Sequence, residues 1–142
     1  MESVYLETSV IGYLASRPSN EIVTAASQFV TRQWWDQRRH EYELFISPAV
    51  IAESNAGDPK AAKERAVFVD GLEVLEITTE TERLAETLQR VPLPRKADVD
   101  ALHIAIAAVN GITFLLTWNC KHIANPALRP IIEQANGYGV RS

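Results

Sequence analysis

Four oxygen-bearing side chains stand where a buried parallel sheet would gather them. Glu7 and Asn119 each follow a short apolar run typical of a strand, whereas Glu53 and Asp100 lie inside apolar segments typical of helices. In an open parallel sheet, ligands bind beyond the carboxyl ends of the strands. An unpaired acid is costly to bury, and a bound divalent cation removes that cost. Oxygen ligands without a Cys or His cluster suit Mg²⁺ or Mn²⁺, so these residues predict metal-assisted hydrolysis of a phosphodiester.

Each of these residues also has a structural interpretation. Glu7 could end a strand in solvent, Glu53 could be an exposed helix residue, and Asn119 could cap a turn. Asp98 and Asp100 would diverge by about 200° on a regular helix, so only one of them can face a single ion. The capping preference of Asp favours Asp98 as the helix N-cap and leaves Asp100 as the ligand. The set of four, rather than any single member, favours a metal site.

Several nearby side chains could contact a substrate that carries phosphates. Basic side chains could fix the position of a phosphate. Trp118 could stack on an unpaired base, although a Trp is more often a packing residue. His103, three residues after Asp100 on the same helix face, could approach the site or be a hydrogen-bonded core histidine. The candidates for substrate contact are Thr8, Arg95, Lys121 and His122.

The composition excludes several classes of protein. The chain has 142 residues, of which 46% are hydrophobic and 23% charged. These values are typical of one globular domain, here residues 1–142, and not of a disordered or repetitive chain. The net charge is −4, so a broad basic surface for nucleic acid is not predicted and any such contact must be local. If Glu7, Glu53 and Asp100 form the metal site, the remaining charge is close to neutral.

Cysteine content and hydropathy indicate a reducing compartment. The single cysteine, Cys120, excludes an internal disulfide and a zinc site built on several thiolates. We therefore expect a cytoplasmic protein. The N-terminus lacks the basic start and apolar block of a signal peptide. The apolar stretch Ala101–Trp118 is interrupted by Asn110 and Gly111, so it predicts two buried elements instead of a membrane span.

Strand-like and helix-like segments alternate along the chain. Continuous apolar runs predict strands that are buried on both faces. Their alternation with helices predicts an α/β protein with a central parallel sheet of four to five strands, covered on both sides. The predicted strands are residues 4–6, 43–46, 74–77 and 114–117. The predicted helices are residues 10–14, 21–39, 48–55, 60–71, 80–90, 98–110 and 126–135, and Pro residues make 91–95 an extended loop.

Local signals predict where several helices begin. Thr8 or Ser9 is expected to cap the first helix, and Ser47 precedes a proline at the start of the third. Thr79, with Glu82 three residues later, predicts a capping box.

The long helix 21–39 carries apolar residues at helical spacing, which predicts a core-facing side. Trp34 and Trp35 diverge by about 100°, so one of them is expected off the core face, where it would indicate a partner surface. The apolar positions are Ile22, Ala25, Ala26, Phe29, Val30 and Trp34.

Four fragments carry a family resemblance in their order and spacing. They are VYLETS from Val4, SPAVIAE from Ser47, DALHIAIA from Asp100 and LLTWNCKHI from Leu115. Together they resemble the PIN domain, and specifically the VapC-like ribonuclease toxins of type II toxin–antitoxin systems. The resemblance covers nearly the whole chain.

The resemblance implies a three-layer α/β/α fold in which three or four acidic residues surround Mg²⁺ or Mn²⁺ and cleave RNA. Carried over by position, Glu7 takes the first acidic slot, Glu53 the second and Asp100 the third. Asn119 takes the fourth, after Thr117 at the end of the strand. In the family the first slot is usually Asp, so the longer Glu7 must shift the metal or the backbone. The fourth slot is often Asp, so neutral Asn119 weakens a second metal site more than the first.

The resemblance also implies a mechanism and partners. The product would carry a 5′-phosphate. Our working hypothesis is that Glu7, Asp100 and Glu53 hold one ion and that Asn119 orients an attacking water. The family forms homodimers and is held inactive by an antitoxin protein, so we expect a homodimer, an RNA substrate and an antitoxin, with no membrane association. Relatives commonly continue past Gly137 with a short apolar strand, and one expectation is therefore a missing C-terminal edge strand.

Two other interpretations stay open. A receiver-like phospho-acceptor domain also places acids at strand ends, but it needs two acids after the first strand and an Asp that ends a central strand. Here Glu7 alone follows the first strand, and Ser47 with Pro48 ends the second. The stronger alternative is a PIN-fold module that binds RNA or protein with weak or no catalysis, because Glu7 replaces the usual Asp.

Overall fold

A parallel sheet forms the centre of the protein in the computed structural model, which describes residues 1–90 and 97–118, with only the backbone for residues 97–100. Among the described residues the sheet has four strands in the order β3-β2-β1-β4, and every pairing is parallel. The strands are β1 (Glu2–Leu6), β2 (Tyr42–Ile46), β3 (Glu73–Val74) and β4 (Phe114–Leu116).

Parallel pairing places the carboxyl ends of β1 and β4 at the same edge of the sheet. Leu6 pairs with Leu116, and the backbone N–H of Glu7 donates to the Leu116 carbonyl at 3.1 Å. The residues that follow the two strands, Glu7 and Thr117, are therefore neighbours although they are far apart in the sequence.

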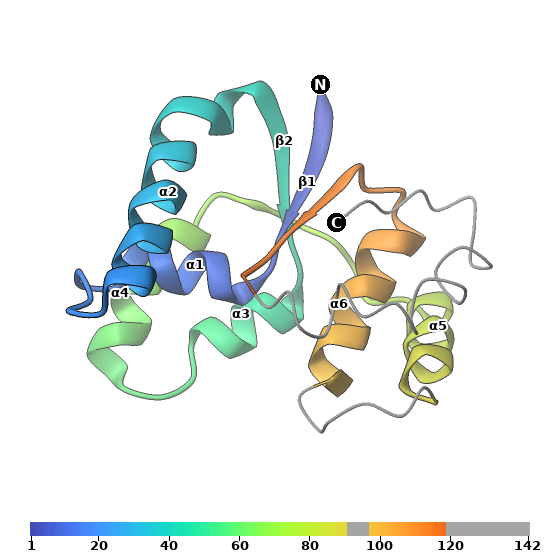
Figure 1. The fold of residues 1–142 in the computed structure, drawn as a ribbon. Helices are drawn as coiled ribbons and strands as arrows, with labels where there is room; N and C mark the ends of the chain where they lie inside the picture. Colours follow the sequence, from blue (N-terminus) through green and yellow to red (C-terminus); the bar gives the residue numbers. More distant parts are fainter. Residues whose placement is uncertain (91–96, 119–142) are drawn as a thin grey trace.

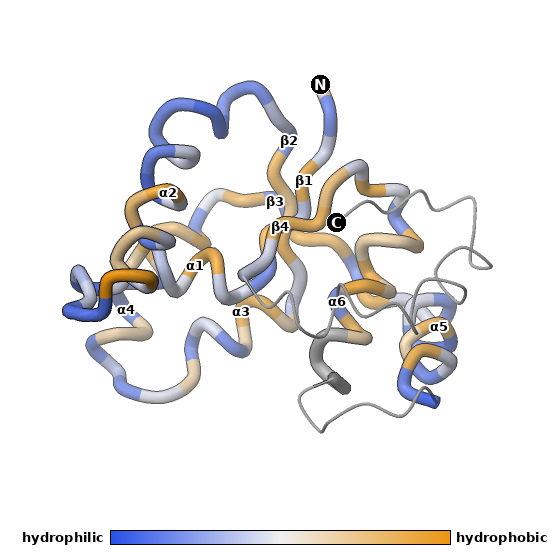
Figure 2. The backbone as a smooth tube through the Cα atoms, viewed as in Figure 1, coloured by the Kyte–Doolittle hydropathy of each residue, from blue (hydrophilic) through white to orange (hydrophobic). Residues whose placement is uncertain are grey.

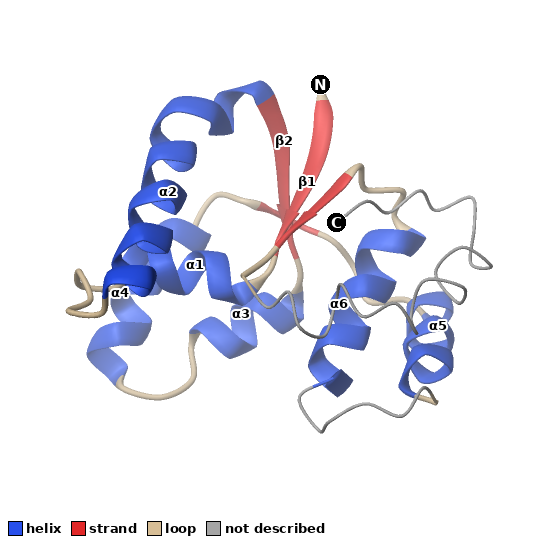
Figure 3. Cartoon of the chain, viewed as in Figure 1, coloured by secondary structure: helices blue, strands red, loops and turns tan. Residues whose placement is uncertain are grey.

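Helices cover both faces of the sheet (Figure 1). Helix α1 packs against α2, α3 and α4, whereas α5 and α6 pack on each other. The two groups flank the strands from opposite sides, which confirms the predicted three-layer α/β/α arrangement (Figure 3). The helices are α1 (Thr8–Ala15), α2 (Ile22–Arg38), the 3₁₀ helix η1 (Arg39–Glu41), α3 (Pro48–Ser54), α4 (Pro59–Val69), α5 (Thr79–Gln89) and α6 (Ala97–Val109).

The hydrophobic core lies where the strands meet the two helical layers. Figure 2 shows the hydrophobic backbone segments converging on the strands in the middle of the molecule. Leu6, Ile46, Ile104 and Ile106 are fully buried. Burying a side chain of this size stabilises a fold by about 1.5–3 kcal/mol, so the apolar ends of β1 and β2 and the middle of α6 anchor the sheet edge.

The predicted strands 4–6, 43–46 and 114–117 are confirmed, whereas the third strand and two helix starts differ from the prediction. Strand β3 is Glu73–Val74 and not residues 74–77, and it is exposed. Glu7, and not Thr8 or Ser9, is the N-cap of α1, because it is the last extended residue after β1 and its carboxylate accepts the Ser9 N–H. Helix α5 is capped by Thr78, one residue before the predicted Thr79, and the Thr78 hydroxyl accepts from the backbone of the third helical residue. The predicted capping box is therefore wrong.

Two further boundaries bear on the predicted site. Ser47 is the N-cap of α3, as predicted, with Pro48 in the first helical position. Helix α6 begins at Ala97, so Asp98 lies inside the first turn and is not the N-cap. Carboxylates are favoured throughout this turn by the helix dipole, which explains why the boundary could not be placed from Asp98 alone.

Some predictions fall outside the described residues. They are the extended loop 91–95, the helix 126–135 and the question of a strand after Gly137. Among the helices that the structure describes, none is long and apolar enough to cross a membrane.

In helix α2, apolar residues that were predicted to face the core are exposed, and polar residues are buried in their place. Ile22 is 85% exposed and Phe29 is 65% exposed, whereas Gln28 and Thr31 are buried. Gln28 faces inward because its side chain bonds the turn that precedes the helix. Its amide accepts from the Ser19 N–H at 2.9 Å and donates to the hydroxyl and carbonyl oxygens of that turn. A polar network thus fixes the orientation of α2.

The two adjacent tryptophans are both half-buried, so the prediction that one would be exposed is wrong. Trp34 stacks on Tyr42 with ring centroids 6.0 Å apart. Trp35 contacts Phe68 edge-on at 5.7 Å, and the Arg39 guanidinium lies over its ring. These neighbouring positions of α2 therefore contact different elements, Trp34 a residue of β2 and Trp35 a residue of α4.

Replacing Gln28 tests which face of α2 contributes to stability. We expect Gln28→Ala to lower the free energy of unfolding by about 1–3 kcal/mol, because it removes the three hydrogen bonds that the buried Gln28 amide makes with the 16–19 turn. Phe29→Ala, one position along the same helix, should change it by less than about 0.5 kcal/mol because that side chain is exposed. Urea denaturation followed by circular dichroism measures both. A larger loss for Phe29→Ala would contradict the structure.

Candidate active site

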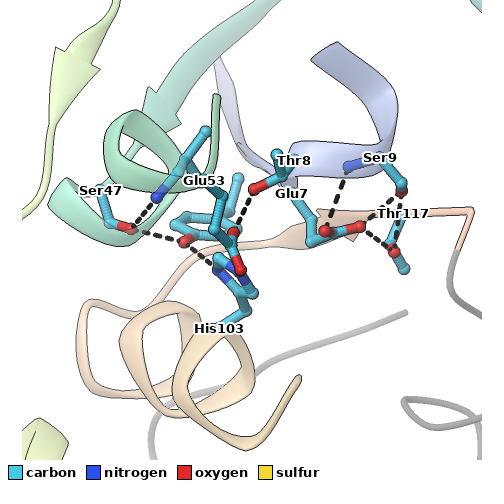
Figure 4. Close-up of polar contacts among 9 residues, drawn as sticks. Glu7, Thr8, Ser9, Ser47, Glu53, His103 and Thr117 are labelled. Carbon is cyan, nitrogen blue, oxygen red and sulfur yellow. Dashed lines mark hydrogen bonds and ion pairs between the residues drawn. The ribbon is translucent and has the colours of Figure 1, made fainter. Parts of the chain in front are cut away.

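Glu7 is a buried carboxylate at the junction of β1 and α1. Its side chain is 5% exposed. Oxygen Oε1 accepts from the Thr117 hydroxyl at 2.6 Å and from the Ser9 hydroxyl at 2.5 Å, and Oε2 accepts from the Ser9 N–H at 3.1 Å. These donors come from α1 and from the end of β4, so the strand register positions the carboxylate (Figure 4). Because all three donors are neutral, they leave its negative charge uncompensated.

Glu53 reaches the same place from α3. The helix begins at Ser47 directly after β2, and its final turn brings Glu53 to the carboxyl edge of the sheet. Oxygen Oε1 accepts from the Thr8 hydroxyl and from His103 Nε2, the latter at 2.9 Å. Burial by itself would raise the pKa of Glu53, but hydrogen bonds from His103 and Thr8 outweigh it and hold the pKa below its usual value. Glu53 is therefore ionised at neutral pH.

Behind the carboxylates lies a buried chain of polar groups. Tyr5, Ser47 and His103 are all fully buried. The Tyr5 hydroxyl lies 2.6 Å from His103 Nδ1 and 2.8 Å from the Ser47 hydroxyl. Burial is the main cause that raises the pKa of Tyr5 above its usual value, and the charges of Glu53 and Glu7 act in the same direction. Tyr5 is therefore a neutral phenol.

The two carboxylates are close enough to share a cation. Ligand atoms of Glu7, Glu53 and His103 all lie within 4.8 Å of one another. Two oxygens bound to one Mg²⁺ lie at most about 4.2 Å apart, so a small side-chain shift would suffice. No Lys or Arg forms an ion pair with either carboxylate among the described residues. Two uncompensated carboxylates with oxygen ligands fit Mg²⁺ or Mn²⁺.

The lone pairs on the two carboxylates also leave room for an ion. No described residue donates to Oε2 of Glu53, and Oε2 of Glu7 accepts a single hydrogen bond within the described part of the chain. An ionised carboxylate offers about four acceptor positions. Each carboxylate therefore keeps an oxygen that can bind a cation without losing a present hydrogen bond.

The structure describes only some of the other predicted site residues. Asp100 lies in the first turn of α6, three residues before His103. Asn119 and the candidate substrate contacts Arg95, Lys121 and His122 fall outside the described residues. Thr8, predicted to contact substrate, has its hydroxyl bonded to Glu53. Its contact with substrate stays a prediction.

Sequence reasoning missed several residues that hold this site together. Ser9 was expected only as a cap, and Tyr5 and Ser47 only as strand and cap residues, yet all three join the polar network. His103 was expected either near the site or as a core histidine, and it is both. Hydroxyl residues directly after a buried strand were the signal that could have indicated this network.

Trp118 lies beside the site and packs against two helices. Its indole Nε1 donates to the Thr31 hydroxyl at 2.8 Å, and its backbone N–H donates to the Ser9 hydroxyl at 2.9 Å. The ring lies 5.7 Å from that of Tyr13 and the residue is 39% exposed. Trp118 is thus a packing residue that keeps part of its ring in solvent.

Comparisons with known proteins identify the fold. The sequence matches the PIN domain family over residues 4–121. Comparison with curated protein sequences gives no match. Among solved structures, VapC20 of Mycobacterium tuberculosis, a sarcin–ricin loop cleaving toxin, has a TM-score of 0.67 and 20% identity, covering 87% of this chain and 95% of that chain. VapBC2 of Rickettsia felis, bound to a DNA fragment from its promoter, has a TM-score of 0.58 and 16% identity, covering 87% and 93%.

Thermal unfolding in the presence of Mn²⁺ tests the carboxylate pair directly. At 100 times its dissociation constant, Mn²⁺ should stabilise the wild-type protein by about 2.7 kcal/mol. Glu7→Gln and Glu53→Gln should lose most of this gain, because each removes one of the two charges. Glu43→Gln, an exposed residue on β2, removes a charge elsewhere and should keep it. Equal stabilisation of all four proteins would exclude a metal site at Glu7 and Glu53.

Proposed function

The chain belongs to the PIN domain family, and we propose that it is a metal-dependent ribonuclease of the VapC-like toxin type. The observation that carries the proposal is the convergence of Glu7 and Glu53 at the carboxyl edge of the sheet, without a Lys or Arg paired to them among the described residues. The family resemblance gives these two residues the first and second acidic slots. The similarity of the fold to VapC20 and VapBC2 supports the toxin type.

The proposed ion is Mg²⁺ or Mn²⁺, held by Glu7, Glu53 and Asp100. When bound, such an ion supplies positive charge that lowers the pKa of water and stabilises the departing oxygen of a phosphodiester. Asp100 joins the set because helical spacing places it on the same face of α6 as His103, whose ring contacts Glu53. The same spacing turns Asp98 about 200° away from Asp100.

The side chains around the ion have separate tasks in this proposal. Ser9 and Thr117 fix Glu7, while Thr8 and His103 fix Glu53, so the two carboxylates are held in place before substrate arrives. Such preorganisation avoids the cost of ordering charged groups during the reaction. In this proposal Asn119 orients the attacking water, and the family resemblance implies that the product carries a 5′-phosphate.

RNA is the proposed substrate and an antitoxin protein the proposed regulator. VapC20 is described as cleaving the sarcin–ricin loop, and VapBC2 was solved on promoter DNA, which supports RNA chemistry and a toxin–antitoxin pair for this chain. A homodimer is proposed from the family resemblance. With a net charge of −4, the chain should bind RNA through a few local cations, for which Arg95, Lys121 and His122 are the candidates. RNA affinity should then be weak without the metal.

A second candidate function is a PIN-fold module with weak or no catalysis. The favouring observation is the double role of Glu7, which accepts three hydrogen bonds and also caps α1. A carboxylate committed to so many donors is a poorer ligand than one with free lone pairs. Cleavage of RNA as a function of Mn²⁺ concentration separates the two candidates.

RNA cleavage by protein variants at the two acidic residues of α6 tests the assignment of Asp100. We expect Asp100→Asn to lower the Mn²⁺-dependent cleavage rate by more than about 100-fold, since even the loss of a residue that only supports a metal ligand costs 10–100-fold. Asp98→Asn removes the same charge two residues away, where the helix turns it from the ion, and should keep most activity.

Both variants should remain folded by circular dichroism, and EDTA should abolish wild-type cleavage. If Asp98→Asn loses activity while Asp100→Asn keeps it, the assignment of Asp100 is wrong. If the wild-type protein cleaves RNA equally well in EDTA, the metal-dependent mechanism is wrong.

A further inference from the structure

A chain of hydrogen bonds connects Ser47, the buried N-cap of α3, through the core to Glu53 in the last turn of the same helix. It links Ser47 Oγ to Tyr5 Oη at 2.8 Å, Tyr5 Oη to His103 Nδ1 at 2.6 Å, and His103 Nε2 to Glu53 Oε1 at 2.9 Å. Figure 4 labels Ser47, His103 and Glu53 of this chain and marks the hydrogen bonds by dashed lines. The proposed metal site does not by itself explain why a fully buried histidine lies at its centre.

The direction of the hydrogen bond to Glu53 follows from its carboxylate end. Glu53 is ionised and can only accept, so His103 Nε2 must carry a proton and donate it. Nδ1, on the other side of the ring, faces the Tyr5 hydroxyl. That hydroxyl also contacts the Ser47 hydroxyl, whose oxygen accepts the Val50 N–H at 3.4 Å. Tyr5 and Ser47 therefore fix the ring so that Nε2–H is aimed at Glu53.

We propose that His103 is a positioning residue for Glu53, held by Tyr5 and Ser47 with its Nε2–H aimed at that carboxylate, and is not itself a metal ligand. Nδ1 is bonded to the Tyr5 hydroxyl and Nε2 faces Glu53 as a donor, so neither nitrogen can bind an ion without breaking the chain. The role toward the ion rests on the proposed function, whereas the position of the Nε2 proton does not.

This arrangement gives Glu53 one fixed oxygen and one free oxygen. His103 and Thr8 both donate to Oε1, and no described residue donates to Oε2. The two donors therefore orient the carboxylate and keep Oε2 available for a cation.

Nitrogen-15 NMR of the protein tests the position of the Nε2 proton without reference to activity. The sequence has His40, His103 and His122, and His103→Gln identifies the His103 signals by their loss. We expect a protonated Nε2 on His103, both without metal and with saturating Mg²⁺. An Nε2 without a proton in either condition would overturn the proposal.

Mn²⁺ binding to matched variants tests the positioning role. His103→Leu removes the donor to Glu53 and should weaken Mn²⁺ binding by about 10–100-fold, as is typical when a residue that supports a metal ligand is removed. His103→Gln keeps an amide N–H near the position of Nε2 and should recover most of that loss. His40→Gln, an exposed residue of η1, should bind Mn²⁺ as the wild type does.

Tyr5→Phe keeps the test decisive if His103→Leu does not fold. It removes the phenolic hydroxyl and leaves the packing of the ring, so we expect the His103 imidazole to lose its fixed orientation and Mn²⁺ binding to weaken. Unchanged Mn²⁺ affinity in the folded variants that lack the donor or its Tyr5 support would overturn the positioning role. If the wild type binds no Mn²⁺, the proposed function fails, and the NMR result alone judges the position of the Nε2 proton.

Discussion

The structure depends on holding two like-charged carboxylates side by side at the carboxyl edge of a parallel sheet. Glu7 and Glu53 have to be kept together against their mutual repulsion and against the cost of burial. The protein meets this constraint with hydrogen-bond donors: hydroxyl groups, a backbone N–H and an imidazole N–H. The donors to Glu7 are neutral, so they lower the cost of burial but leave its charge in place. The charge that remains is what makes the edge attractive to a cation.

Each donor is delivered by a different element, so the site depends on the whole fold. The parallel register of β1 and β4 brings Thr117 beside Glu7. The start of α3 directly after β2 aims Glu53 at the same edge, and α6 carries His103 across from the opposite layer. A shift of one residue in either strand pairing would turn these side chains to the other face. The core that fixes the register is thus as important to the site as the carboxylates.

Apolar burial orients the elements at the centre of the molecule, whereas polar contacts orient helix α2 at its periphery. At the end of β1 and in the middle of α6, apolar residues are buried, as a sheet covered on both faces requires. In α2, apolar residues such as Ile22 and Phe29 face solvent, and the helix is oriented by the polar contacts of Gln28. Helical spacing identifies an apolar side of a helix. It does not say whether another element is there to cover it.

The sequence by itself determined the α/β class, the strands, and Glu7 and Glu53 as neighbours, because apolar runs and strand-end acids are local signals that parallel topology gathers at one edge. It did not determine that Glu7 also caps α1, since that depends on where the extended backbone ends. Nor did it decide between the two interpretations of His103. Only the tertiary structure did so, because its partners Tyr5 and Glu53 lie on other elements far along the chain, and hydrogen bonding between distant segments leaves no periodicity in the sequence.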